Sequence, residues 1–245
     1  MDYNTYIFSI KEIYIYGMQG LMVCTLVGYL FYNSYIAVIS MLPLLIIFYK
    51  IKKSELVKRE QHKLNLQFRD GILSVSASLQ AGYSIENGFE QALGELTKLY
   101  DKKQPIINEF QKIIMQLKLN VTIEELLGDL AKRSGVEDIE SFAEMFAIAK
   151  RTGGDFIKII QKTSSNLSEK IETQEEVVLA IAGKQMEQKI MSMVPFGIII
   201  YVRLTSSEFL SVLYGNVLGV TVMTVCLFVY GFSYWCGKKI VDIEI

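Results

Sequence analysis

Residues 79–86 read LQAGYSIE, and residues 117–124 read LKLNVTIE. In both stretches a Gly or Asn is followed two residues later by a Ser or Thr, and then by a new apolar-periodic run. Gly and Asn tolerate the left-handed conformation that ends a helix, while Ser, Thr and Asp are preferred where the next helix starts. Residues 153–155, GGD, show the same pattern, with Asp in place of Ser or Thr. The pattern therefore predicts a tight turn between helices at three places. The predicted turn and cap residues are Gly82, Ser84, Asn120, Thr122, Gly153, Gly154 and Asp155.

The segments between these turns have the periodicity of amphipathic helices. Leu64, Phe68 and Ile72, for example, recur at spacings of four residues and form one apolar stripe. The predicted helices cover residues 55–81, 84–99, 105–117, 122–135, 137–152 and 155 onward. Six helices with one apolar face each predict an antiparallel bundle around a shared core.

Local signals set several of these limits. Pro105 suits the first position of a helix, where a missing amide is tolerated. Thr122 and Glu125 have the Thr-x-x-Glu spacing of a capping box. The last helix has no strong breaker before Gly183 and Pro195, so we expect it to continue directly into the apolar segment that follows.

Four apolar stretches flank the predicted bundle, at residues 13–32, 35–49, 190–205 and 212–235. The chain is 51% hydrophobic with a mean hydropathy of +0.30 but still 21% charged, a composition between those of soluble and fully membrane-embedded proteins. A membrane-spanning helix needs about 20 apolar residues. The second stretch is short and contains Pro43. A signal peptide is the competing interpretation of the first stretch, which lacks a basic start and a small-residue cleavage site.

Lysines and arginines lie beside the ends of these stretches that face the bundle and the C-terminus, whereas the link at residues 33–34 is uncharged. This distribution predicts that the bundle and both termini are cytoplasmic. The sequence thus predicts an all-α membrane protein in which a cytoplasmic antiparallel six-helix bundle is flanked by two pairs of transmembrane helices. The predicted domains are a transmembrane pair at residues 1–50, the bundle at 51–189 and a second pair at 190–245.

Motifs for catalysis or for metal and cofactor binding are missing from the sequence. It contains no Walker-type phosphate loop, no HExxH zinc motif and no kinase signature. Its one histidine, His62, has no cluster of Cys or carboxylates at metal-binding spacing. The net charge of −1 does not favour nucleic acid as a partner. We therefore expect no catalytic, cofactor-binding or metal-binding residues.

Several stretches resemble the F domain of type II secretion systems, and most closely the form in the platform proteins B and C of tight-adherence (Tad) pili. They are RDG at residues 69–71, SLQAGYSI at 78–85, LAKRS at 130–134 and AKRTGGDF at 149–156. The resemblance covers about residues 67–201. Two-domain platforms are usual in type II secretion and type IV pili, so the single F domain of this chain favours the Tad-like branch.

The resemblance implies a bacterial inner-membrane platform without catalytic residues. Such proteins sit above a hexameric cytoplasmic ATPase and help to move pilin subunits from the membrane into a filament. The implied partners are that ATPase, a second platform protein or further copies of the chain, pilin subunits and membrane lipid. A membrane-anchored helical signalling or scaffold protein is the alternative function.

We name six charged residues as candidates for docking the ATPase or another partner: Arg69, Asp70, Lys132, Arg133, Lys150 and Arg151. Two alternatives stay open. The cations at helix ends are also favoured there by the helix dipole. Arg69 and Asp70 would equally suit an internal pair that closes the bundle.

Overall fold

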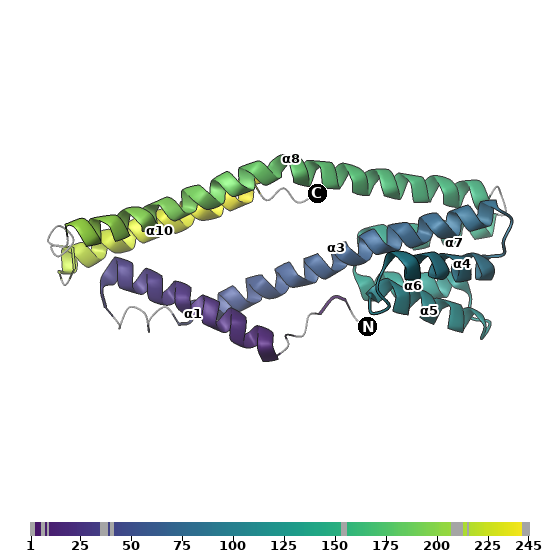
Figure 1. Cartoon of the computed structure of the whole chain (residues 1–245), viewed down its shortest axis with the longest axis horizontal. Coiled ribbons are helices and arrows are strands. Elements are labelled where there is room, and N and C mark those ends of the chain that lie inside the picture. Colours follow the sequence, from purple (N-terminus) through teal and green to yellow (C-terminus); the bar gives the residue numbers. More distant parts are fainter. Residues whose placement is uncertain are drawn as a thin grey trace. The chain divides into compact units, whose positions relative to one another are not determined.

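The computed structural model describes residues 3–5, 8, 10–34, 39, 42–152, 156–206, 213–214 and 216–241. All regular secondary structure in these residues is α-helical (Figure 1). The helices are α1 (Ile10–Tyr32), α3 (Leu44–Gln80), α4 (Ile85–Leu99), α5 (Pro105–Leu117), α6 (Ile123–Ser134), α7 (Glu137–Thr152), α8 (Phe156–Thr205) and α10 (Val217–Val241).

The chain divides into two compact units. One comprises Met1–Ile7 and Lys53–Thr173, and is called the core unit here. The other comprises Phe8–Lys52 and Gln174–Ile245, and is called the apolar unit. Helices α3 and α8 belong to both, because each passes from one unit into the other without a break.

Left-handed residues close the turns of the core unit. Gly82 follows α3 with φ +88°, and the Ser84 hydroxyl then accepts a hydrogen bond of 3.3 Å from the backbone N–H of Asn87 at the start of α4. Asn120 has φ +62° before α6. Gly135 ends α6 with φ +61°. The third predicted turn, Gly153 to Asp155, lies outside the described residues.

One predicted N-cap hydrogen bond, that of Thr122, does not form. Thr122 occupies the N-cap position of α6 with an extended backbone, but its side chain makes no capping hydrogen bond, so the capping box with Glu125 does not form.

The continuity of α3 differs from the sequence-based expectation, which placed a span at residues 35–49 and a separate helix at 55–81. The structure joins residues 44–80 into one helix that begins just after Pro43. The sequence changes from apolar to charged residues near Lys50, but no Gly or Pro lies there. Helical hydrogen bonds can therefore form in both the apolar and the charged part. The predicted continuity of the last helix is confirmed, since α8 is a single helix of 50 residues.

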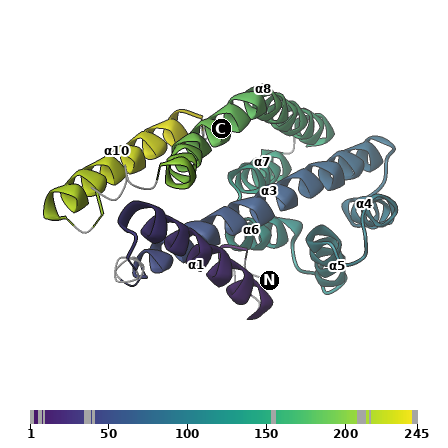
Figure 2. The ribbon, with the colours of Figure 1, turned by 60° about the vertical axis from the view of Figure 1, so that its left-hand side comes forward.

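The core unit is built around one cluster of buried side chains from α3, α4, α5, α6, α7 and α8. Within it α4 lies beside α5, and α6 beside α7 (Figure 2). Fully buried phenylalanines from four helices dominate the cluster, and each stabilises the fold by about 1.5–3 kcal/mol. They are Phe68, Phe89, Phe110, Phe142 and Phe146.

Close helix packing at α3 depends on Gly71. A Cβ atom at this position would lie 2.5 Å from Cζ of Phe110 and 3.2 Å from Cδ1 of Leu96. The missing side chain therefore lets α4 and α5 place these core residues directly against the α3 backbone.

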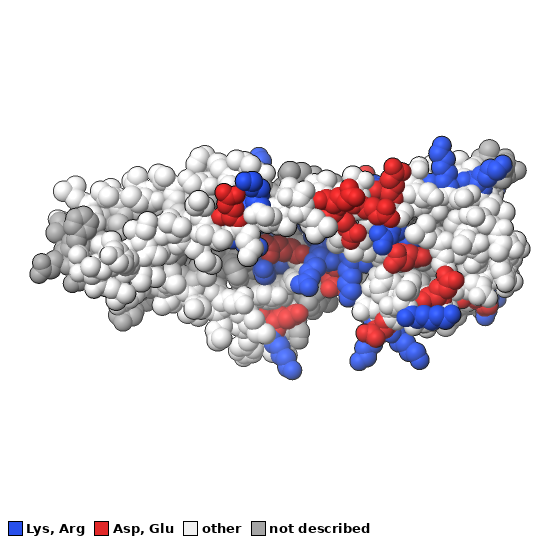
Figure 3. Space-filling model, turned by 45° about the horizontal axis from the view of Figure 1, so that its top comes forward, with Lys and Arg blue, Asp and Glu red and all other residues white. Residues whose placement is uncertain are grey.

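The apolar unit contains two helices long and apolar enough to cross a membrane, α1 and residues Val217–Ile240 of α10. Of the other two predicted spans, the one at residues 35–49 overlaps the start of α3 and includes positions outside the described residues. The one at residues 190–205 lies within α8 and is shorter than the usual minimum of about 17 residues. Figure 3 shows a broad surface without charged side chains at the left, over α8 and α10.

Candidate functional site

Arg69 and Asp70 form a pair on α3, with Nε of Arg69 3.0 Å from Oδ1 of Asp70. The other oxygen of Asp70, Oδ2, accepts a hydrogen bond of 2.5 Å from the hydroxyl of Tyr100, just after α4. Burial, and then the hydrogen bond to Asp70, raise the pKa of Tyr100 to about 12. Both members of the pair are mostly covered, at 19% and 23% side-chain exposure. Through these contacts, Asp70 connects α3 to the end of α4.

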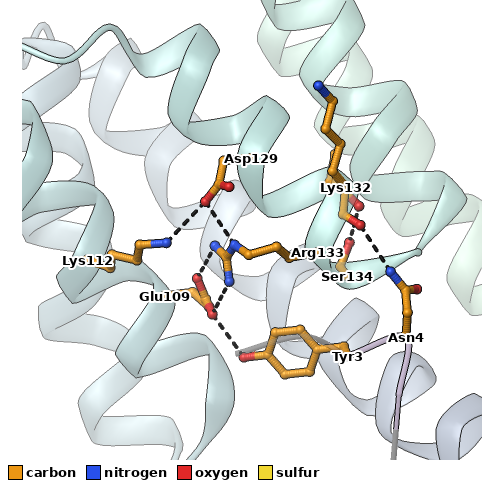
Figure 4. A network of polar contacts seen from close by, with 9 residues as sticks. Tyr3, Asn4, Glu109, Lys112, Asp129, Lys132, Arg133 and Ser134 are labelled. Atoms are coloured by element: carbon orange, nitrogen blue, oxygen red, sulfur yellow. Dashed lines mark hydrogen bonds and ion pairs between the residues drawn. The ribbon is translucent and has the colours of Figure 1, made fainter.

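Arg133, in the last turn of α6, is at the centre of the strongest polar network (Figure 4). Its Nη1 and Nη2 atoms donate to Oε1 and Oε2 of Glu109 at 2.8 and 2.7 Å, and its Nε donates to Asp129 at 2.8 Å. Lys112 also donates to Asp129, at 3.1 Å. A bidentate Arg–carboxylate pair is among the strongest polar contacts in proteins.

The Glu109 side chain is only 4% exposed. Burial alone would raise its pKa, but the hydrogen bonds and positive charge of Arg133 outweigh burial and hold the pKa below its usual range. The same opposition applies to Asp129, where the hydrogen bonds of Lys112 and Arg133 outweigh burial and lower the pKa. Both carboxylates are therefore ionised at neutral pH and act as structural acceptors.

The N-terminal residues Tyr3 and Asn4 complete this network from a distant part of the sequence. The Tyr3 hydroxyl donates to Oε1 of Glu109 at 3.1 Å, and its backbone N–H donates to the carbonyl of Arg133 at 2.9 Å. Nδ2 of Asn4 donates to the carbonyl of Lys132 at 3.1 Å. The last carbonyls of α6, which have no partner within the helix, thus gain partners from outside it.

A glycine makes room for this contact. A Cβ atom at Gly135 would lie 1.9 Å from Oδ1 of Asn4, so a side chain there would displace the N-terminal segment. Sequence periodicity did not identify Tyr3, Asn4 or Glu109. One signal existed, because Glu109 lies three residues after Ile106 and four before Ile113, on the apolar stripe of α5. A carboxylate there requires a buried partner.

The other predicted docking residues lie at the surface. Lys132 is exposed, and its side chain extends away from the network in Figure 4. Lys150 is 40% exposed and pairs with Glu124 at 2.8 Å. Arg151 is exposed. Lys150 contacts the first turn of α6, whereas Lys132 is in the last turn, so the structure places the two at opposite ends of that helix.

Among the described residues no group of three or more His, Cys, Asp or Glu side chains is arranged to hold a metal ion. His62 is exposed on α3. The polar residues that the structure gathers are thus arranged to hold helices together and to present charge.

The family model for protein F of the type II secretion system matches residues 72–203, more than half of the 245-residue chain. Neither a curated protein nor a solved structure matches the chain significantly. Members of the matched family are structural platform proteins of the inner membrane and are not enzymes. The long apolar helices α1 and α10 agree with a membrane location. The chain belongs to the type II secretion system protein F family.

Proposed function

We propose that this protein is the inner-membrane platform of a Tad or type IV pilus, or of a type II secretion-like machine, and couples a cytoplasmic hexameric ATPase to the assembly of pilin subunits. The observation that carries the proposal is the continuity of α3 and α8. Each helix connects the charged core unit to the apolar unit without a turn or loop. A displacement of one end of such a helix is transmitted to the other.

In the proposed topology, α1 with the start of α3 and the end of α8 with α10 form two transmembrane hairpins in the bacterial inner membrane. Residues 51–189 form an antiparallel six-helix bundle in the cytoplasm, together with both termini. The apolar surface of α1 and α10 supports this placement. The lysines beside the spans support the orientation, because cytoplasmic flanks of membrane helices are enriched in Lys and Arg.

The proposed docking face for the ATPase contains the exposed cations Lys132, Lys150 and Arg151. Arg69, Asp70 and Arg133 would support that face, because their contacts join α3 to the end of α4 and α6 to α5. Charge-complementary docking would then move a tightly packed core as one body. Pilin subunits, a second platform protein or another copy of the chain would contact the apolar unit within the membrane.

Reversing charge tests the docking face. We expect the full-length chain with Lys150→Glu and Arg151→Glu, purified in mild detergent, to lose its co-purifying ATPase. The matched control reverses Lys102 and Lys103, two exposed residues in the loop before α5, and should retain it. Equal recovery of the ATPase by both variants would contradict the proposed face. No ATPase with the unmodified chain, and normal filaments without it, would favour the signalling or scaffold alternative.

A further inference from the structure

A groove of about 460 Å³ opens in the surface of the apolar unit between α1, the start of α3 and α10. Gly20, Cys24, Leu45, Phe48, Leu227 and Tyr234 are among its lining residues. The lining is almost entirely apolar. Tyr230 also lines it, but its hydroxyl donates to the carbonyl of Ser192 at 2.8 Å and is thus already satisfied by the protein.

The helices around the groove have defined directions. Leu45 of α3 packs at Gly20 of α1, while the Tyr49 hydroxyl donates to the carbonyl of Ile13 at 2.6 Å, so α3 runs opposite to α1. The start of α10 packs on the end of α1, where Met223 joins Leu30 in one cluster. Because later residues of α10 line the groove with the middle of α1, α10 also runs opposite to α1. The chain therefore leaves the groove at the same end on α3 and on α10.

Lysines follow the groove on both helices at that end. Lys52 is one helical turn beyond Phe48, and Lys238 is one turn beyond Tyr234, so both continue the faces that line the groove. Lys50 and Lys239 are exposed next to them. Glu12, in the first turn of α1, contributes one negative charge, which leaves this end with an excess of positive charge.

The cations at the two ends of the unit have different contacts. Arg203, near the end of α8, donates to the carbonyl of Tyr29 at 2.9 Å and to Oδ1 of Asn33 at 2.6 Å, and its guanidinium lies 4.0 Å from the centre of the Tyr29 ring. Nζ of Lys52 lies 5.8 Å from the centre of the Tyr16 ring, and Nζ of Lys239 lies 5.4 Å from the centre of the Trp235 ring. Each lysine carries three N–H donors, so it can contact the protein and a phosphate together.

We propose that the groove binds one acyl chain of an anionic phospholipid, with the headgroup phosphate held by Lys52 and Lys238 and attracted by Lys50 and Lys239. This inference rests on the membrane placement in the proposed function. The groove follows α10 from Leu227 to Tyr234, which is about 10 Å at a rise of 1.5 Å per residue. That length fits within one leaflet, about 15 Å or half of the hydrocarbon core, and is short for a transmembrane helix.

Native mass spectrometry of the full-length chain in mild detergent tests the site. The probes are phosphatidylglycerol and phosphatidylcholine with identical acyl chains, and glycerol phosphate, which has the anionic group without a chain. We expect the unmodified protein to retain phosphatidylglycerol more than phosphatidylcholine and not to retain glycerol phosphate. Lys52→Gln with Lys238→Gln should weaken phosphatidylglycerol binding by about fivefold for each lysine, and leave phosphatidylcholine unaffected.

A pair of glycines provides matched variants for the acyl chain. Gly231 lines the groove and Gly197 lies on α8 away from it, and a Cβ atom at either would have no neighbour within 4 Å. Both leucine variants should therefore fold, which circular dichroism and gel filtration verify. We expect Gly231→Leu to lose both lipids and Gly197→Leu to bind as the unmodified protein does.

Three results would overturn the proposal. Equal lipid binding by Gly231→Leu and Gly197→Leu would exclude the groove. Retention of glycerol phosphate alone would indicate a simple anion site. A lipid-free dimer that Gly231→Leu dissociates would show that a second copy occupies the groove. Because the assay involves neither an ATPase nor a filament, its failure is distinct from failure of the proposed function.

Discussion

At the scale of single residues, the pair between Glu109 and Arg133 determines how the core unit tolerates a buried charge. Glu109 is almost fully buried among apolar residues of α5, and Arg133 donates to both of its oxygens. Burial of a carboxylate is favourable only when such partners replace water. The pair is thus a point at which α5, α6 and the N-terminal segment stabilise one another.

Loss of the guanidinium should destabilise the core unit. We predict that Arg133→Met lowers the free energy of unfolding by about 3 kcal/mol, because it leaves the Glu109 carboxylate buried without its partner. Thermal unfolding in detergent measures the change. Lys132→Met is the matched control, since this neighbouring side chain is exposed, and it should have little effect. Equal losses in the two variants would contradict the role given to the pair.

The same carboxylate predicts a dependence on pH. Its pKa is lower in the folded protein than the ordinary value of 4.5, so its contribution is complete above that value and is lost as the pH falls through the lowered pKa. We expect the unfolding temperature to fall as the pH drops below about 4.5. Replacing the pair by Glu109→Leu with Arg133→Met should reduce that fall. An unchanged acid dependence in the double variant would show that other groups cause it.

Gly71 provides a test of close packing. We predict that Gly71→Val destabilises the core unit by about 1–3 kcal/mol, because its Cβ would approach Phe110 within 2.5 Å. Gly94→Ala is the control, since a Cβ there meets no atom within 4 Å and Ala favours a helix by about 1 kcal/mol over Gly. Destabilisation by Gly94→Ala and tolerance of Gly71→Val would contradict the packing described.

At this scale, a structural feature can be predicted from sequence only when its cause lies in the residue itself or in its close neighbours along the chain. The left-handed φ of Gly82 and of Asn120 follows from each residue's own backbone preference, which the sequence contains. The contact between Tyr3 and Glu109 joins residues 106 positions apart, and no short-range pattern records such a partner. The positions of Arg133 and Lys150 could be assigned to helix ends from sequence, but their ion pairs depend on tertiary packing.

At the scale of helices, α3 and α8 are the two elements that belong to both units. The lack of a strong breaker before Gly183 and Pro195 predicted the continuity of α8. The continuity of α3 was missed because a change from apolar to charged residues was interpreted as a boundary. Such a change in side chains indicates that the two parts of a helix face different surroundings. It does not affect the backbone hydrogen bonds of the helix.

A break in α8 should uncouple the units. Lys184 is exposed, and Lys184→Pro removes a helical hydrogen bond at a cost of about 3 kcal/mol. Pro195 already lies within α8, but there Phe196 packs on Phe31 and Tyr230 and holds the local geometry. We predict that Lys184→Pro retains the ATPase and fails to assemble filaments. Lys184→Ala should assemble them normally, and normal assembly by both would argue against transmission through α8.

At the scale of the whole molecule, one polypeptide combines a charged, tightly packed core unit with an apolar unit that has helices of membrane-spanning length. Its family was predicted from short motifs at turns and helix ends, such as residues 78–85 and 149–156, and the family model confirms that prediction. Two other features could not be predicted from sequence: the path of the chain from one unit to the other, and the groove of the apolar unit. Both depend on the packing of helices that are distant in the sequence. This combination supports the proposed role of a mechanical coupler.

The most direct measurement is the number of surface filaments in cells from which the gene has been deleted, with pilin synthesis and processing monitored in the same cells. If the protein is the assembly platform, pilin is still made and processed, filaments are absent, and the unmodified gene restores them. Intact filaments in the deletion strain would contradict the platform function.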